Sequence, residues 1–259
     1  MPRRIPAREI ATLNDYTKFI EESIQGGPIW YRGVSNIDHK LQPSIYRHAE
    51  KNDPVKMFEI EKGIYNWYAQ RGTYLAEKDL LTKPELIFLL QHYRIPTRLL
   101  DWTENPFIAL FFALLNLRSK KDAIVWILNP TEWNAQISGS GVRSIISYNE
   151  PQLEAYNIKF DRPEIFQAQP IAIYGCHNNA RIVAQRGVFI IFGKSPAPME
   201  EHFATFPATS KALQKIIIKK GVKEQLFRSL RAIGYTDSVV FPDLEGLAVE
   251  IKRLHGFEV

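Results

Sequence analysis

The chain has 259 residues, of which 45% are hydrophobic and 24% charged, a composition typical of a soluble globular protein with a substantial core. Its formal net charge of +5 permits an anionic partner such as a nucleotide or a nucleic acid, but the excess is modest. No apolar run approaches the roughly 20 residues of a membrane-spanning helix, no secretory signal is recognisable, and the single Cys176 cannot form an intramolecular disulfide, so we expect a cytoplasmic protein with no membrane partner.

The first half of the chain is predicted to be mainly helical. Apolar residues at helical spacing indicate two amphipathic helices, and two prolines suit the first turns of two more. Thr12 is the expected N-cap of the first helix, and Gly26-Gly27-Pro28 should end it. The predicted helices cover residues 11–25, 55–70, 84–91 and 107–117, and a short strand covers residues 29–33.

The second half is richer in strand signals. The apolar run at 123–128 is typical of a strand buried on both faces, whereas residues 129–170 carry no regular pattern. Further strands are predicted at 171–174, 181–192, 212–218 and 239–241, and helices at 223–233 and 247–254. No proline- or glycine-rich linker divides the chain. We therefore expect a single α+β domain, with a helical N-terminal half packed on a β-rich C-terminal half.

The segment from Leu89 to Leu115 is the most informative part of the sequence. Its second half, from Pro106, is apolar enough to be buried, and its first half is dense in polar and aromatic groups. Polar groups beside a buried helix need hydrogen-bond partners, either in the protein or in a ligand. The residues concerned are His92, Tyr93, Thr97, Arg98, Asp101, Trp102 and Thr103. Two alternatives remain open: Arg98 and Asp101 could form a buried ion pair, and His92 could be a structural hydrogen-bonding group.

Two shorter motifs add candidate site residues. In Tyr31-Arg32-Gly33, an arginine at a strand end beside a glycine can direct its planar fork at a phosphate or a ribose while the backbone approaches closely. A structural ion pair is the alternative role for Arg32. Arg47 could lie near the same pocket, although a turn before a surface helix explains it equally well.

Asp243 and Glu245 follow the last predicted strand, at its junction with a helix. Because they are two residues apart, only one is expected to face a given pocket. Either carboxylate could instead favour the N-terminus of the helix through the helix dipole.

Common enzyme signatures are missing from the sequence. It contains no phosphate-binding GxxxxGK[ST] loop, no GxGxxG and no GxSxG motif. The six histidines lack metal-ligand spacing and one cysteine cannot build a thiolate zinc site, so no metal is expected. The neighbouring Cys176 and His177 are interpreted as incidental.

Together, these segments resemble the FRG domain, named for its phenylalanine/tyrosine-arginine-glycine motif. The resemblance rests on WYRG, LQPSIYR, LLQHYRIPTRLLDWTENPFIALFFAL, RIVAQRGVFIIF and FPDLEGLA, with the central segment the most specific. It extends over residues 29–254 and leaves residues 1–28 as an N-terminal helical extension. Arg94 stands where the family usually carries glycine.

The layout of this family is similar to that of ADP-ribosyltransferases, which implies an ADP-ribosyltransferase-like C-terminal half and NAD as substrate. Arg32 matches the early arginine that grips NAD, Asp101-Trp102-Thr103 matches the second element, and Asp243 or Glu245 matches the late catalytic acid. The residues implied in NAD binding are Tyr31, Arg32, Gly33, His92, Tyr93, Thr97, Arg98, Asp101, Trp102 and Thr103.

Such an enzyme cleaves the nicotinamide–ribose bond and transfers ADP-ribose to a protein, RNA or DNA acceptor, or hydrolyses NAD. Bacterial enzymes of this type often act as toxins or in phage defence, and a neutralising antitoxin would then be a partner. A second hypothesis is a non-catalytic nucleotide- or nucleic-acid-binding module. A third makes the polar central segment purely structural.

Overall fold

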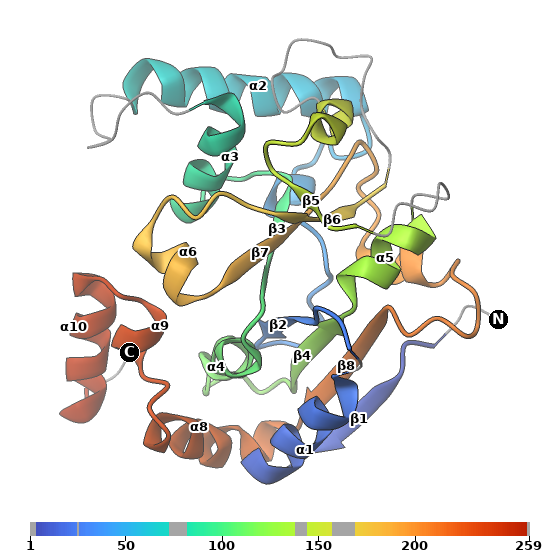
Figure 1. Ribbon diagram of the computed structural model, residues 1–259. Helices are drawn as coiled ribbons and strands as arrows, with labels where there is room; N and C mark the ends of the chain where they lie inside the picture. Colours follow the sequence, from blue (N-terminus) through green and yellow to red (C-terminus); the bar gives the residue numbers. More distant parts are fainter. Residues whose placement is uncertain (1–3, 25, 73–81, 138–143, 157–168, 258–259) are drawn as a thin grey trace.

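The strands of the described residues form one mixed sheet in the order β1-β8-β4-β2-β3-β7-β6-β5 (Figure 1). This computed structural model describes residues 4–24, 26–72, 82–137, 144–156 and 169–257. β1 pairs with β8 and β5 pairs with β6 in parallel, and the other neighbours are antiparallel. The strands are β1 (Ala7–Ile10), β2 (Trp30–Val34), β3 (Leu99–Thr103), β4 (Ala123–Leu128), β5 (Ile146–Ser147), β6 (Ile171–Tyr174), β7 (Gly187–Ile191) and β8 (Leu213–Ile218).

The sheet separates in its middle, between β2 and β3. These strands share a single register pair, Tyr31 with Thr103, whereas β2 pairs with β4 along its whole length. An antiparallel ladder continued from that pair would join Arg32 to Trp102 and Gly33 to Asp101. Because it does not continue, the two strands diverge and leave space between them.

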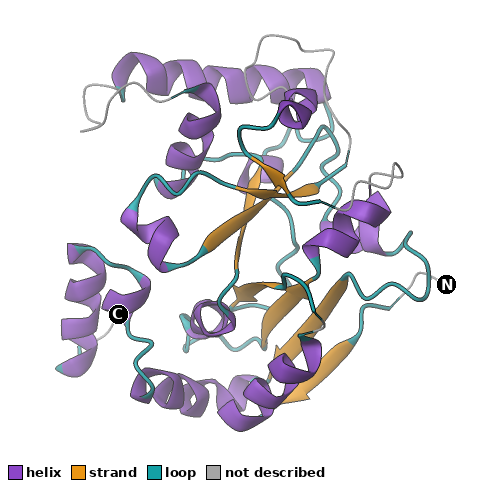
Figure 2. Cartoon of the chain, viewed as in Figure 1, coloured by secondary structure: helices purple, strands orange, loops and turns teal. Residues whose placement is uncertain are grey.

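Helices cover both faces of the sheet (Figure 2). They are α1 (Leu13–Ser23), α2 (Pro54–Arg71), α3 (Lys83–His92), α4 (Pro106–Leu114), α5 (Pro130–Ile137), α6 (Ala180–Ala184), α7 (Met199–Phe203), α8 (Lys223–Ala232), α9 (Asp237–Val240) and α10 (Leu244–Leu254), with 3₁₀ turns at Ser44–Arg47, Pro151–Tyr156 and Lys220–Val222. Helices α1, α4 and α8 share a buried apolar cluster with β1, β2, β4 and β8. No helix in the described part of the chain is long and apolar enough to cross a membrane.

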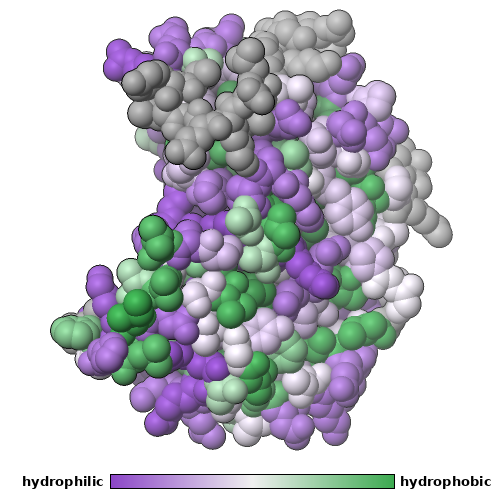
Figure 3. Space-filling model, turned by 60° about the vertical axis from the view of Figure 1, so that its left-hand side comes forward, coloured by the Kyte–Doolittle hydropathy of each residue, from purple (hydrophilic) through white to green (hydrophobic). Residues whose placement is uncertain are grey.

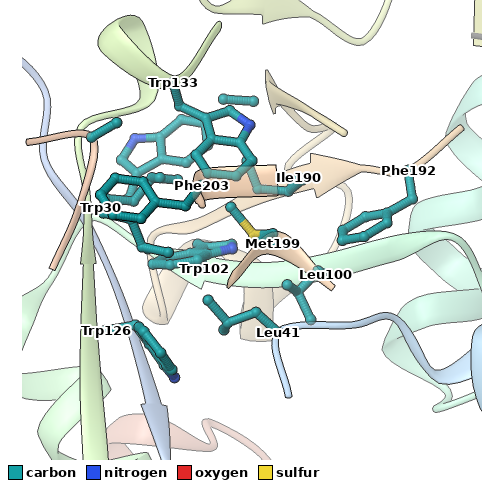
Figure 4. Packing of buried hydrophobic residues seen from close by; sticks show 14 of the residues in the cluster. Trp30, Leu41, Leu100, Trp102, Trp126, Trp133, Ile190, Phe192, Met199 and Phe203 are labelled. Carbon is teal, nitrogen blue, oxygen red and sulfur yellow. The ribbon is translucent and has the colours of Figure 1, made fainter. Parts of the chain in front are cut away.

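β4 shows how the core is built on both sides of the sheet. All six of its residues are buried. Val125 and Ile127 face the cluster with α4, while Trp126 and Leu128 face a second cluster that contains Trp30, as the alternation of side chains along a strand requires. Figure 4 shows this second cluster, in which aromatic rings from several elements pack around Met199. The prediction of a strand buried on both faces is confirmed.

The predicted α+β class is confirmed, and most predicted elements are present. Thr12 caps α1 with a reciprocal capping box, and α4 begins at Pro106 as expected. Residue 25, the predicted end of the first helix, lies outside the described residues. The division into a helical front and a β-rich back is wrong in detail, because β1, β2, β3 and β4 all come from the first 128 residues. We missed β1, β3 and β5, because these short strands carry no clear alternation of apolar and polar residues.

Two strand predictions in the second half are wrong. The segment 181–192 is not one strand but α6, a turn and β7. Asn179 starts α6 by accepting a hydrogen bond from the backbone N–H of Ile182 (2.9 Å), and the positive φ of Arg186 (46°) ends it. Residues 239–241 lie in and after α9, because the carbonyls of Thr236 and Asp237 accept helical hydrogen bonds. The β-branched residues of both segments suggested strands, and local capping overrode that preference.

The described residues among the first 28 pack on the rest of the molecule. β1 extends the sheet beside β8, and Tyr16 of α1 is fully buried with its hydroxyl donating to the carbonyl of Pro106 (2.6 Å). The extension is therefore joined to the core through both its strand and its helix. The boundary between 1–28 and 29–254 stays a prediction.

Candidate functional site

A pocket of about 290 Å³ lies where β2 and β3 separate, and we call it the central pocket. This volume is at the lower end of the range of about 300–1,000 Å³ seen for small-molecule sites. Seven predicted NAD-binding residues line it, namely Tyr31, Arg32, Gly33, His92, Asp101, Trp102 and Thr103. Its other lining residues are Phe88, Gln91, Arg94, Phe112, Arg181, Ile182, Gln185, Gly187 and Phe189. On the face in Figure 3, hydrophilic residues gather in a hollow beside a lobe rich in hydrophobic residues.

Arg32 occupies the gap between the diverging strands. Its Nη1 donates a hydrogen bond to the backbone carbonyl of Asp101, so the guanidinium replaces the ladder partner that β2 would otherwise supply. Burial lowers the pKa of Arg32, and the nearby charge of Asp101 opposes that shift. The side chain of Arg32, which lies inside the pocket, thus joins β2 to β3.

Asp101 is the pocket carboxylate. Its Oδ2 accepts a hydrogen bond from Nε2 of Gln91 (2.8 Å), and the side chain remains open to solvent through the pocket. Burial among protein atoms nevertheless raises its pKa, while Arg32 and Gln91 act in the opposite direction. An accessible carboxylate with a perturbed pKa in a pocket is a typical feature of a functional site.

Two predicted threonines hold the pocket walls in place. Thr103 is buried, and its Oγ1 donates to the carbonyl of Gln185 (2.6 Å) and accepts from the backbone N–H of Asn105 (2.9 Å). Thr97 is also buried, and its hydroxyl donates to Oε1 of Gln91. Thr97 thereby orients the amide that contacts Asp101, although it does not line the pocket itself.

The structural reason for a glycine at position 33 differs from the predicted one. A Cβ at this position would lie 1.8 Å from the carbonyl oxygen of Ala109 and 2.6 Å from the backbone nitrogen of Ala113, both in α4. The close backbone approach that we expected toward a ligand is therefore an approach to a buried helix. Gly33 does border the pocket, but packing against α4 requires the glycine.

Arg98 lies away from the central pocket. Its side chain is almost fully buried and its Nε forms an ion pair with Glu61 of α2 (2.7 Å to Oε2), while Nη1 donates to the carbonyl of Phe192 (3.2 Å). This is the buried ion pair that was the alternative to ligand binding, with Glu61 in place of Asp101.

We expect Arg98→Met to destabilise the fold by about 3–5 kcal/mol, because it leaves the carboxylate of Glu61 buried without its cation. Urea unfolding measures the loss, and the double variant Arg98→Met/Glu61→Leu should recover most of it. A single variant that unfolds like the wild-type protein would show that the pair does not hold α2 in place.

Tyr93 also points away from the pocket. It is 60% exposed and lines a separate apolar groove with Trp67 and Tyr68 of α2. Its ring contacts that of His92, with centroids 4.9 Å apart. His92 therefore borders the central pocket while Tyr93, the next residue, faces another surface.

The late carboxylates lie outside the pocket wall. Asp243 and Glu245 are exposed, and Oδ1 of Asp243 caps α10 by accepting from the backbone N–H of Gly246 (2.8 Å). This is the helix N-terminal role that was the alternative for these residues. Both still lie close enough to Arg181 for their charges to raise its pKa. The 243–245 turn is thus near Arg181, which itself lines the pocket.

Arg181 and Arg94 were not predicted as site residues, although both line the pocket. Arg94 was noted only because it replaces a glycine, and the structure shows why glycine is usual there: its φ is 60°, a left-handed conformation that costs a non-glycine residue about 1–2 kcal/mol. Arg181 was hidden in the segment predicted as a strand. Arg181 lies on α6, whose N-cap is Asn179, and it lines the pocket.

Arg47 lies near Arg32, since its charge contributes to the lowered pKa of that arginine. It does not line the central pocket. Among the described residues, no group of three or more His, Cys, Asp and Glu side chains is arranged to hold a metal ion.

Comparison with known proteins gives one match. Residues 27–122 match the family model of the FRG domain, a range that contains β2, β3 and α4 but neither Arg181 nor the 243–245 turn. It is shorter than the predicted 29–254. No curated protein and no solved structure matches the chain.

Proposed function

We propose that this chain, which contains an FRG domain over residues 27–122, binds NAD in the central pocket, cleaves the nicotinamide–ribose bond and transfers ADP-ribose to a macromolecular acceptor. The observation that most supports this proposal is the meeting of Arg32 and Asp101 where the sheet separates. A cation and a carboxylate in one partly apolar pocket suit NAD. Its diphosphate is anionic, and the C1′ carbon of its ribose becomes cationic during the reaction.

The chemistry asks little else of the protein. The bond between the nicotinamide nitrogen and C1′ of the ribose breaks, its electron pair leaves with nicotinamide, and positive charge develops on the ribose. A carboxylate beside C1′ stabilises that charge. Asp101 is the one carboxylate among the described residues that line the pocket. C1′ then bonds to an oxygen or nitrogen of the acceptor, which releases its proton; water in this role would hydrolyse NAD.

The aromatic walls suit the flat parts of the substrate. Tyr31 is buried, and burial raises its pKa to about 12, so its hydroxyl stays protonated and can donate a hydrogen bond. Phe88 and Phe189 pack against each other with centroids 5.0 Å apart and both border the pocket. Such rings can hold a nicotinamide by stacking or edge contacts.

The acceptor is proposed to be a nucleic acid or a protein, and the net charge of +5 leans toward nucleic acid. A toxin or phage-defence role in the cytoplasm, with an antitoxin that neutralises it, belongs to the same proposal. No metal is part of the proposed reaction.

The direct test is to incubate the purified protein with NAD and to follow nicotinamide release by chromatography, with and without RNA, DNA and a protein mixture. Asp101→Asn, prepared in the same way, controls for contaminating NAD-cleaving enzymes. We expect nicotinamide release by the wild-type protein and ADP-ribose attached to one acceptor class. Equal release by both preparations, or none with any acceptor, would contradict the proposal.

A non-catalytic nucleotide-binding module is the second candidate function. The placement of Asp243 and Glu245 favours it, because the acids that the resemblance assigns to catalysis are exposed outside the pocket wall. Calorimetry separates the two functions: a module would bind NAD with a measurable heat and release no nicotinamide.

A further inference from the structure

Arg94 places a guanidinium in the central pocket in spite of its backbone. The residue follows α3 and has a φ of 60°, where glycine is the less costly residue. Its backbone N–H donates to the carbonyl of Gln91 (3.0 Å), so the turn ends the helix. The turn itself does not need an arginine side chain, and that side chain borders the pocket.

Arg181 reaches the same pocket from α6. It is half-buried, and its guanidinium lies over the ring of Phe241, 4.4 Å from the centroid. No hydrogen bond or ion pair joins the guanidinium of Arg181, or that of Arg94, to another residue in the part of the chain that the structure describes. Solvent reaches these guanidinium donors, so they are available to an acceptor on a ligand.

Both arginines line the central pocket. Burial lowers the pKa of Arg181 most strongly, and the positive charge of Arg94 lowers it further. Asp243, Glu245 and Asp101 oppose this shift from the surroundings, but none of them is bonded to either guanidinium. Two like charges side by side, facing a pocket, repel each other until an anion is bound between them.

Arg32 cannot take this role with its whole fork, because Nη1 already donates to the carbonyl of Asp101. Arg94 and Arg181 line the same pocket, and no described residue accepts a hydrogen bond from either guanidinium. Planar guanidinium forks match phosphate oxygens bidentately.

We propose that Arg94 and Arg181 form a phosphate-binding site in the wall of the central pocket, which takes the diphosphate of a nucleotide ligand. The identification of that ligand with NAD rests on the proposed function. The phosphate site itself does not, since binding can be measured without turnover.

The test measures binding of inorganic pyrophosphate and of ADP-ribose by isothermal titration calorimetry. We expect Arg94→Gly to weaken both ligands by about tenfold or more, since a charge-assisted hydrogen bond is lost. Arg181→Gln should have a similar effect. Glycine suits the left-handed turn, so Arg94→Gly should melt at or above the wild-type temperature, which separates lost binding from lost folding.

Arg186→Gly is the matched control. Arg186 also has a positive φ (46°) and an exposed side chain, but it does not line the pocket. The change removes the same charge and relaxes the same kind of turn. We expect it to leave both affinities within about twofold of wild type, because exposed charges are screened by salt.

Three outcomes would overturn the phosphate site: no binding of either probe, equal losses in Arg94→Gly and Arg186→Gly, or full affinity in Arg181→Gln. The site and the proposed function can fail separately. Arginine-dependent binding without nicotinamide release would support the site and reject the enzyme. If Arg94→Gly and Arg186→Gly released nicotinamide equally well, the enzyme would be supported and the phosphate site rejected.

Discussion

Gly33→Ala is expected to unfold most of the protein, with a loss of more than about 4 kcal/mol, the range reserved for severe steric conflict in a core. The new Cβ would lie 1.8 Å from the carbonyl oxygen of Ala109 and 2.8 Å from its carbonyl carbon. Both atoms are backbone of α4, so no side-chain rotation relieves the contact. Relief would require α4 to move off β2, and α4 is buried along most of its length.

Chemical unfolding followed by circular dichroism measures this loss, and Gly63→Ala is its matched control. Gly63 lies within α2, where an added Cβ meets nothing within 4 Å, so alanine should stabilise that helix by up to about 1 kcal/mol. A folded Gly33→Ala protein with normal stability would mean that β2 and α4 are not in the contact described. If that folded protein also lost NAD binding, the glycine would instead serve the ligand, as the sequence first suggested.

Helices α1 and α4 could be predicted because the residues that begin them are recognisable in the local sequence. Pro106 begins α4 and Thr12 caps α1, and each of these signals acts within one turn of the residue that carries it. The buried strand β4 was equally readable, because a run of six apolar residues has few other uses. Such features can be recognised without knowing which elements pack against them.

The separation of β2 from β3 could not be predicted, because it depends on pairing between segments about 70 residues apart. The polar density of the central segment did indicate a pocket, and Arg32 and Asp101 do meet there. Which polar group faces the pocket and which supports its wall is decided in three dimensions. Arg98 pairs with Glu61, and no spacing rule links those two positions.

The catalytic role of the late acids stays a prediction, and their positions give each of them a different local setting. Asp243 stands at a helix start, and the helix uses its carboxylate as a cap. Arg181, on a helix predicted as strand, lies between that turn and the pocket. The resemblance to ADP-ribosyltransferases implied catalysis by Asp243 or Glu245, while Asp101 is the carboxylate that lines the pocket among the described residues.

Asp101→Asn is expected to reduce the rate of nicotinamide release by about 10²–10⁴-fold, the range for removal of a positioned charge or acid–base group. Asparagine keeps the shape of the side chain and an oxygen that can accept from Gln91, so NAD affinity and the fold should persist. Steady-state kinetics measures the loss. Asp243→Asn and Glu245→Gln are the controls, and on this geometry they retain most of the activity. Loss in Glu245→Gln with an active Asp101→Asn would return catalysis to the late acid.

The pH dependence gives the same assignment a second readout. Burial raises the pKa of Asp101, so the carboxylate needed for catalysis forms only above the ordinary aspartate value of about 3.9. The acidic limb of the rate profile should therefore lie above that pH and vanish in Asp101→Asn. A raised pKa in the folded state also means that stability falls as pH rises through it. Asp101→Asn should then be more stable than wild type at neutral pH, while it releases nicotinamide more slowly. If Asp101 is a functional carboxylate that costs the fold stability, its replacement should raise stability and lower the rate together. If Asp101 only supports the pocket wall, the variant should be less stable than wild type.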